Sequence, residues 1–141
     1  MDRALAESLR YTAPTHMIPR KTRSDLNVSG GTIPAEAEVI CFLGSANRDD
    51  RKFASPDKFD MRRADLDVER AFASSANHAA FGGGRHFCLG ATMAKTEVEI
   101  AVNRLLDSTV GLRFVEESPA DEGLFLRGPR KLPLAFTPTT H

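Results

Sequence analysis

Apolar residues recur at helical spacing in two stretches of the chain and form short runs elsewhere. The first predicted helix covers residues 3–11 and ends before Pro14, and its inner side carries Ala4, Leu5, Ser8 and Leu9. The second covers residues 89–106, and its apolar stripe consists of Ala94, Val98, Ala101 and Leu105. The pattern therefore predicts a short helix at the start and a long helix in the last third of the sequence.

Between these helices the pattern changes to short runs typical of strands. They are divided by the turn residues Ser-Gly-Gly and Pro-Ala-Glu, and they cover residues 16–20, 26–28, 32–33 and 38–43. We expect them to form a small antiparallel meander of strands. Residues 44–87 lack a regular pattern apart from one or two helical turns at 64–73, and so long a loop is usually functional. Residues 110–137 predict two or three more strands, so the fold class is α+β.

Composition and charge fit one soluble globular domain. The 141 residues are 41% hydrophobic and 27% charged. Nineteen basic and nineteen acidic residues balance, which gives no electrostatic reason to expect nucleic acid or an anionic membrane as a partner. The longest apolar run, residues 39–43, is too short to span a bilayer, and residues 1–10 contain no signal-peptide core. We therefore expect a cytoplasmic protein.

The two cysteines, Cys41 and Cys88, lie far apart, which argues against a disulfide scaffold and a structural zinc site. Cys88 follows a glycine run at 82–84 and precedes the long predicted helix. Free N–H groups and the helix dipole at such a position favour a thiolate. The glycine run permits a tight turn, and Gly90 would let a flat ligand approach the sulfur.

The residues alone leave three interpretations of Cys88 open. A free cysteine in a glycine-rich turn is commonly a buried structural residue. A redox-active or nucleophilic cysteine would need a positioned base, and His86 is near in sequence. A phosphate-binding loop is the weakest interpretation, because Phe87 stands where the dinucleotide pattern has its last glycine and no Gly-Lys-Ser/Thr follows.

The cysteine segment resembles the haem-binding signature of the cytochromes P450, F-G-x-G-x-[HR]-x-C-x-G-x-x-x-A. Every fixed position matches in Phe81-Gly82-x-Gly84-x-His86-x-Cys88-x-Gly90-x-x-x-Ala94. Further motifs of this family occur in the family's order, including Glu7-x-x-Arg10, Ala46-Asn47-Arg48-Asp49 and the segment 53–60. The resemblance covers essentially the whole chain.

The resemblance implies a fold and a domain organisation. Residues 1–141 would form a single partial domain, the haem-binding C-terminal part of a bacterial-type soluble P450. Its elements would be a K-like helix, a small β-sheet, a meander segment without regular structure, the cysteine loop, a long L-like helix and a terminal β-hairpin.

The resemblance also implies the cofactor, haem b (iron protoporphyrin IX), with Cys88 as the axial ligand of the iron. His86 and Arg20 would hold the haem propionates, and the less favoured alternative for Arg20 is an exposed strand residue. The remaining cofactor-binding positions carried over from the signature are Phe81, Gly82, Gly90 and Ala94. No catalytic residue beyond the haem ligand is implied.

A buried ion-pair group is implied as a structural element. It would join Glu7, Arg10 and an arginine of the meander segment, for which Arg63 is the best candidate and Arg62 and Lys58 are alternatives. The chain departs from the family pattern nearby. The stretch between Arg63 and His78 is longer than usual, and Asp50 replaces a proline.

The activity implied is that of a monooxygenase that activates O2 at the haem iron and hydroxylates a small hydrophobic substrate. A redox partner such as a ferredoxin would dock on the proximal face, near Arg85, Lys95 and Arg104. In this family a long helical region with an acid–threonine pair precedes Glu-x-x-Arg, and we expect the chain to be truncated before that motif. The alternative is a non-catalytic truncated remnant, or a haem-binding or interaction fragment, which would expose apolar surface.

Overall fold

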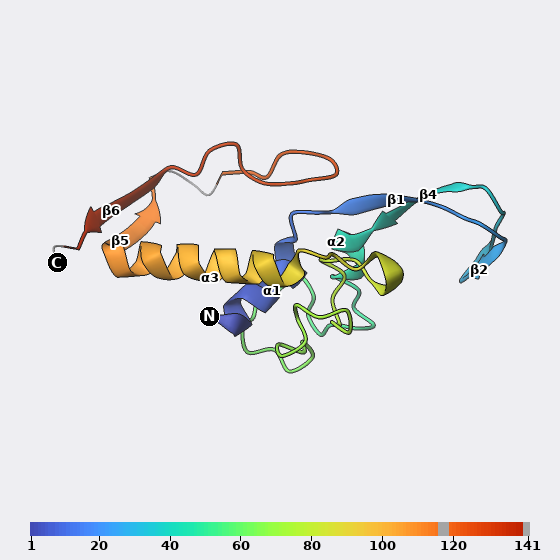
Figure 1. Ribbon diagram of the computed structural model, residues 1–141, viewed down its shortest axis with the longest axis horizontal. Helices are drawn as coiled ribbons and strands as arrows, with labels where there is room; N and C mark the ends of the chain where they lie inside the picture. The colour runs from blue at the N-terminus through green and yellow to red at the C-terminus, as the bar shows by residue number, and fades with distance from the viewer. Residues whose placement is uncertain (116–118, 140–141) are drawn as a thin grey trace.

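The computed structural model describes residues 1–115 and 119–139 as a mixture of helices and small antiparallel sheets (Figure 1). The helices are α1 (Asp2–Thr12), α2 (Leu43–Ala46), the short 3-10 helix η1 (Gly84–His86) and α3 (Ala91–Ser108). The strands are β1 (Met17–Lys21), β2 (Leu26–Val28), β3 (Gly31–Ile33), β4 (Glu38–Phe42), β5 (Thr109–Phe114) and β6 (Leu134–Pro138). The predicted α+β class is confirmed.

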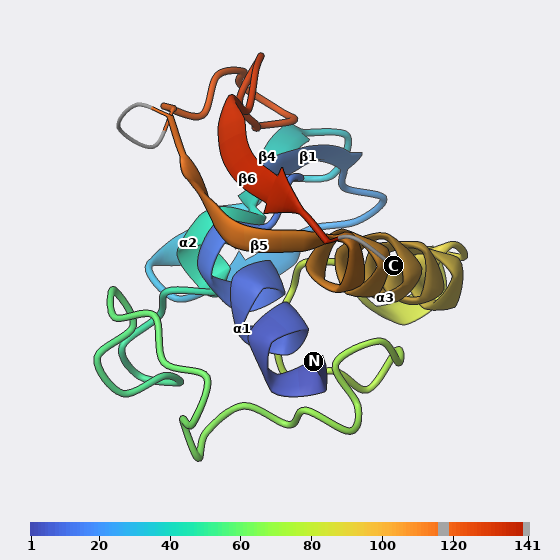
Figure 2. The same cartoon turned by 90° about the vertical axis from the view of Figure 1, so that its left-hand side faces the viewer.

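The two main helices lie close to their predicted bounds. Helix α1 ends at Thr12 because Ala13, which precedes Pro14, takes an extended conformation. Helix α3 begins at Ala91 rather than at residue 89, since residues 89–90 form a turn that follows the cysteine loop (residues 81–88). Figures 1 and 2 show α1 crossing near the first turns of α3, whose far end leads directly into β5. The start of α3, where the cysteine lies, is therefore the end that faces the rest of the molecule.

The strand pairing corrects the predicted meander. Strand β1 pairs with β4 in antiparallel register, with Ile18 opposite Cys41, and β2 pairs with β3. The chain thus folds into nested hairpins, because the tight turn before Gly31 joins β2 to β3 and leaves β1 to pair with the returning strand. Residue Leu43, predicted as the end of a strand, instead begins α2, where its side chain is buried.

Residues 47–83 contain no regular helix or strand, so the helical turns predicted at 64–73 are replaced by isolated turns. Hydrogen bonds from side chains hold this segment together in place of the backbone hydrogen bonds of a helix or sheet. The Asn77 amide accepts the N–H of Asp67 (3.1 Å) and donates to the Asp65 carbonyl (2.7 Å). A small core of Ala6, Phe53, Leu66 and Ala71 joins the segment to α1.

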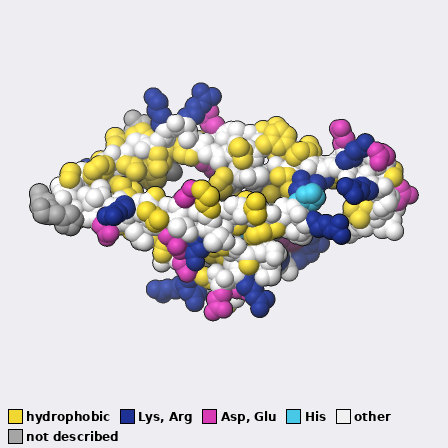
Figure 3. Space-filling view, viewed as in Figure 1, with side chains coloured by type: hydrophobic (Ala, Val, Ile, Leu, Met, Phe, Trp, Pro, Cys, Tyr) yellow, Lys and Arg dark blue, Asp and Glu magenta, His cyan; other side chains and the backbone are white. Residues whose placement is uncertain are grey.

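Much of the apolar surface is exposed. Helix α3 buries only Ala91 among its eighteen residues. Its solvent-exposed apolar side chains include Met93, Val98, Ile100 and Leu106. Figure 3 shows hydrophobic side chains spread over the face that α3 and the C-terminal hairpin present. The predicted exposure of apolar surface is thus present. Within the described residues, no helix combines the length and hydropathy needed to cross a bilayer.

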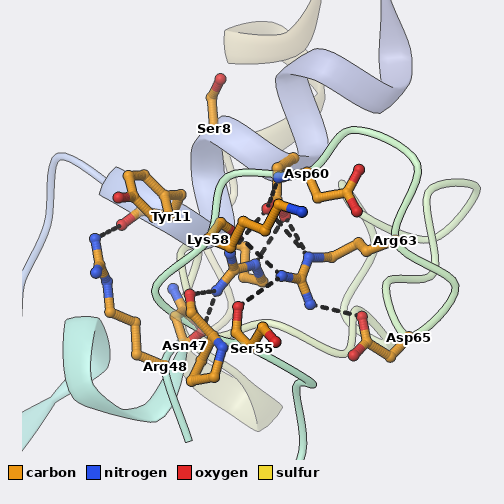
Figure 4. Close-up of polar contacts among 12 residues, drawn as sticks. Ser8, Tyr11, Asn47, Arg48, Ser55, Lys58, Asp60, Arg63 and Asp65 are labelled. Atoms are coloured by element: carbon orange, nitrogen blue, oxygen red, sulfur yellow. Dashed lines mark hydrogen bonds and ion pairs between the residues drawn. The ribbon is translucent and has the colours of Figure 1, made fainter. Parts of the chain in front are cut away.

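A buried carboxylate, Glu7 of α1, joins the helix to residues 47–83, which we call the irregular segment. Its two oxygens lie 2.7 and 2.8 Å from nitrogens of Arg10, and both are within 3.1 Å of Nε of Arg63. The backbone N–H of Asp60 donates to the same carboxylate at 2.8 Å. The structure therefore brings the three residues of the expected ion-pair group together, and Figure 4 shows the contacts around Arg63 and Asp60.

The two guanidinium groups extend this network to backbone carbonyls of the irregular segment. Arg10 donates to the carbonyls of Asn47 (3.0 Å), Pro56 (2.8 Å) and Lys58 (3.2 Å). Arg63 also pairs with Asp65 at 2.7 Å. Lys58 thus contributes its carbonyl rather than its ammonium group, and the alternative Arg62 is exposed. Each charge in the group has a partner, which burial of charges requires.

The Glu7 carboxyl is held in its ionised form. Burial raises its pKa, but the hydrogen bonds from Arg10, Asp60 and Arg63 outweigh this and lower the pKa below the ordinary value. Asp65 behaves similarly: burial raises its pKa, and the Ala54 N–H and the Arg63 guanidinium lower it further than burial raises it. Both carboxylates therefore stabilise the fold only while they are charged.

Replacing Glu7 by glutamine should lower the free energy of unfolding by about 3–5 kcal/mol, because the buried Arg10 guanidinium loses its counter-charge and Arg63 keeps only Asp65 as an acidic partner. Urea unfolding followed by circular dichroism measures this change. The matched control is Glu122→Gln, whose carboxylate meets Arg130 at 2.6 Å on the surface and should matter by less than about 1 kcal/mol. Equal effects of the two substitutions would contradict the role assigned to Glu7.

Acid should destabilise the chain through the same carboxylates. The contribution of these carboxylates to the free energy of unfolding should be constant above the unfolded-state pKa of Asp and Glu, about 4. It should fall as pH decreases from there through the lower folded-state values, because the unfolded chain then binds more protons. Urea unfolding at a series of pH values measures this slope, which Glu7→Gln should reduce. An unchanged slope in that variant would contradict the account.

Candidate functional site

A cavity of about 400 Å³ lies between α1, β1, the cysteine loop and α3. Its walls are largely apolar and come from segments far apart in the sequence, with side chains of Leu9, Ile18, Leu43, Phe81, Ala94 and Val98. Its polar lining comprises Arg20, His86 and Cys88, with Thr15 near the end of α1. A mostly apolar pocket with a few convergent polar groups is typical of a small-molecule or cofactor site.

All of the predicted cofactor-binding residues except Gly90 line this cavity. Gly90 is the N-cap residue of α3, with φ −85°, and a Cβ added there would lie 3.9 Å from the Cys88 Sγ atom. This is ordinary van der Waals contact. The structure thus gives no backbone reason for glycine at position 90, and any need for it would arise only from a ligand on the sulfur.

The cysteine loop is held in shape by its own backbone. The N–H of Cys88 donates to the Phe81 carbonyl at 2.9 Å and closes the loop. Gly82 and Gly84 have φ of 72° and 58°, the left-handed region that glycine enters without strain. A Cβ at Gly82 would also lie 3.3 Å from the His86 carbonyl oxygen. These two glycines let the chain turn back so that Cys88 reaches the cavity.

Cys88 itself is exposed and lies directly before the first turn of α3. The N–H groups of the first turn of a helix have no partners within the helix, and they carry the positive end of its dipole. The neighbouring Leu89 side chain is fully exposed, so it does not cover the sulfur. The sulfur is therefore accessible from the cavity and lies next to the N-terminus of α3.

Two basic side chains, Arg20 of β1 and His86 of η1, line the same cavity. Both are exposed, and neither forms an ion pair with an acidic side chain within residues 1–115 and 119–139. Arg20 donates only to the adjacent Pro19 carbonyl, at 2.7 Å. Both side chains are thus available for the carboxylates of a ligand that occupies the cavity.

Phe81 is fixed by aromatic neighbours on both sides. Its ring centroid lies 5.5 Å from that of Phe72 and 6.3 Å from that of Phe87. His78, buried at 4% exposure, packs against the same ring at 6.4 Å. Such aromatic pairs add stability beyond their buried area. The aromatic wall of the cavity at Phe81 is therefore held by contacts with three neighbouring rings.

Sequence reasoning missed several residues of the site. Leu9 and Val98 were placed on the inner faces of their helices but were not assigned to the cavity that they line. Phe72 and His78 lie in the irregular segment, where no periodicity marks them. Their only signal in the sequence is that a phenylalanine and a histidine stand shortly before the glycine run.

The residues present fit a haem group. A sulfur at the cavity is the soft ligand that suits iron, the walls are apolar, and two basic groups can meet carboxylates at the edge of the ring. The ion-pair group of α1 lies outside this cavity and supports the segment that leads into the loop. Its place is consistent with a structural role.

The model of the family described as Cytochrome P450 matches residues 1–131. The chain is 44% identical over 135 residues to pulcherriminic acid synthase of Bacillus subtilis, covering 95% of this chain and 33% of that protein. It is 32% identical to a steroid C26-monooxygenase of Mycobacterium tuberculosis, covering 96% of this chain and 35% of that protein. The chain thus spans about a third of the length of these relatives.

Solved structures agree with the sequence relatives. CYP109Q5 from Chondromyces apiculatus superposes with a TM-score of 0.85 at 33% identity, covering 99% of this chain and 34% of that chain. P450BioI, solved in complex with an acyl carrier protein that carries hexadec-9-enoic acid, superposes with a TM-score of 0.82 at 34% identity, covering 96% of this chain and 33% of that chain. Because family model, relatives and structures all match nearly the whole chain, it belongs to the cytochrome P450 family.

Proposed function

We propose that this chain forms the proximal, haem-binding part of a cytochrome P450 monooxygenase, with Cys88 as the axial ligand of haem b. The observation that carries the proposal is the cavity in which Cys88, His86 and Arg20 meet although β1 lies far from the cysteine loop in sequence. A buried structural cysteine is not consistent with the exposed sulfur. Two unpaired basic groups beside it are what a dicarboxylate cofactor requires.

Each residue of the site has a stated part in holding the cofactor. Cys88 would bind the iron, His86 and Arg20 would each bind a propionate, and Phe81 would pack beside the thiolate. Gly82 shapes the loop, and Ala94 lies on the face of α3 that lines the cavity. Bound haem would supply oxygen activation, for which an electron-rich axial thiolate favours O–O cleavage.

The activity, substrate and redox partner are extended from relatives to this chain. One relative is named as a steroid C26-monooxygenase, which supports oxidation of a small hydrophobic substrate. A redox partner such as a ferredoxin would meet the surface near Cys88, where Arg85 and Arg104 are exposed. Lys95, also expected there, pairs with Asp2 and Glu99 at 3.5 Å, so it offers less charge to a partner.

A haem-binding fragment without oxygenase activity is the second candidate function. It is favoured by the open apolar side chains of α3, since oxygen activation needs a dry, enclosed site. The two candidates differ in what electrons from a ferredoxin would produce. A monooxygenase would form hydroxylated product in proportion to the electrons consumed, whereas a fragment with an open site would release reduced oxygen species without product.

Cys88→Ser should abolish the absorption band that carbon monoxide gives with ferrous, thiolate-ligated haem, because serine offers no thiolate. The matched control is Cys41→Ser, which removes the other thiol, in β4, and should leave the band unchanged. The measurement is a reduced, carbon-monoxide difference spectrum of the purified chain loaded with haem. Retention of the band in the Cys88 variant would overturn the assignment of the ligand.

Arg20→Ala and His86→Ala should each weaken haem binding by roughly tenfold to a hundredfold, the range expected for a charge-assisted hydrogen bond. Haem titration followed by absorbance gives the dissociation constants. Arg23→Ala is the matched control, because Arg23 is exposed close to β1 and does not line the cavity. If haem affinity fell equally in all three variants, a direct contact with the propionates would be excluded.

A further inference from the structure

Two buried polar side chains, Asn47 and His78, accept hydrogen bonds from two consecutive residues directly before the cysteine loop. Oδ1 of Asn47 accepts the N–H of Ala79 at 2.6 Å. Nδ1 of His78 accepts the N–H of Ala80 at 3.2 Å. Residues 79–82 form a turn, in which the Gly82 N–H donates to the Ala79 carbonyl at 2.9 Å. Two separate acceptors at its start fix the backbone there more firmly than one.

These hydrogen bonds connect the ion-pair group to the cysteine loop. The carbonyl of Asn47 accepts from Arg10 at 3.0 Å, and the side chain of Asn47 reaches Ala79. Phe81 follows two residues later, packs against the His78 ring, and accepts the Cys88 N–H at 2.9 Å. An unbroken series of contacts therefore leads from the Glu7 carboxylate to the backbone of Cys88.

Neither side chain is optimised for stability alone. Asn47 is 0% and His78 is 4% exposed, yet within the described residues Nδ2 of Asn47 has no hydrogen-bond partner. Nε2 of His78 has no acceptor in good hydrogen-bond geometry, although the Ala71 carbonyl lies close enough to raise the pKa of the ring. An unsatisfied buried donor is costly, so the hydrogen bond that each side chain accepts from the loop backbone must offset that cost. What an apolar side chain lacks is the acceptor that each of these residues directs at the loop backbone.

His78 is suited to accept because its imidazole is neutral. Burial lowers its pKa, the ammonium group of Lys52 acts in the same direction, and the Ala71 carbonyl opposes them with a smaller effect. Since Nδ1 accepts the Ala80 N–H, the ring proton lies on Nε2. The imidazole therefore acts as a fixed acceptor at neutral pH.

We propose that Asn47 and His78 are positioning residues that hold the cysteine loop so that the Cys88 sulfur faces the cavity. They act through Ala79, Ala80 and Phe81 rather than by contact with the ligand. This inference rests on the proposed ligation of haem by Cys88. Its backbone part can be tested in the absence of haem.

The test compares substitutions that remove the acceptor with one that keeps it. Asn47→Leu and His78→Phe preserve the size of the side chain and remove the acceptor, whereas His78→Asn retains an oxygen close to the position of Nδ1. Leu66→Ala is the control, because it damages the small core while leaving both hydrogen-bond acceptors in place. Backbone hydrogen exchange of residues 79–88 is measured in the purified full chain, and the carbon-monoxide spectrum is measured after haem loading.

Asn47→Leu and His78→Phe should speed exchange in residues 79–88 by about tenfold relative to the rest of the chain, the effect of losing one buried hydrogen bond. Both should also convert part of the thiolate band to the band of haem that has lost its thiolate. His78→Asn should restore both readouts, and Leu66→Ala should change neither selectively.

The inference is overturned if residues 79–88 exchange as in the parent chain, if Leu66→Ala has the same local effect, or if His78→Asn behaves like His78→Phe. A parent chain that shows no thiolate band would refute the proposed ligation instead. Hydrogen exchange would then still decide whether Asn47 and His78 hold the loop.

Discussion

The Glu7 carboxylate, enclosed between two guanidinium groups, is the constraint on which the rest of the structure depends. Residues 47–83 have no strand or helix that could order them, so their backbone groups must find other partners. Arg10 and Arg63 supply these by donating to carbonyls of the segment, while Glu7 neutralises Arg10 and shares Arg63 with Asp65. Removal of the carboxylate would leave buried positive charge, which is more costly than the loss of any apolar contact here.

The ion-pair group also influences the cysteine loop, because it holds the irregular segment that leads into the loop. Asn47 and His78 accept hydrogen bonds from the backbone directly before the loop, and the chain then reverses direction at Gly82 and Gly84. The cavity forms where this loop meets β1 and α3, so its basic residues and its sulfur are brought together by contacts made elsewhere. Family membership is shown by the whole chain, whereas the chemistry proposed for it depends on this one region.

Local features were predictable from the residues themselves, whereas contacts between distant segments were predictable only where the family resemblance implied them. The periodicity of residues 89–106 identified α3, and the spacing from Phe81 to Ala94 identified the loop, because neighbours in sequence decide both. The pairing of β1 with β4 and the start of α2 at Leu43 were predicted wrongly, since both depend on partners far away in the chain. The contact of Arg63 rather than Arg62 with Glu7 likewise depends on how the irregular segment folds back, and the Asn77 amide closes its longer stretch without displacing Arg63.

The central claim is that the Cys88 sulfur binds the iron of a haem seated in the cavity between β1 and α3. X-ray absorption at the iron edge of the haem-loaded chain tests this claim most directly, because it reports the elements in the first coordination shell. The account predicts four nitrogen ligands from the porphyrin and one sulfur ligand, with the sulfur absent in Cys88→Ser and present in Cys41→Ser. A first shell of nitrogen and oxygen alone in the unsubstituted chain would contradict it.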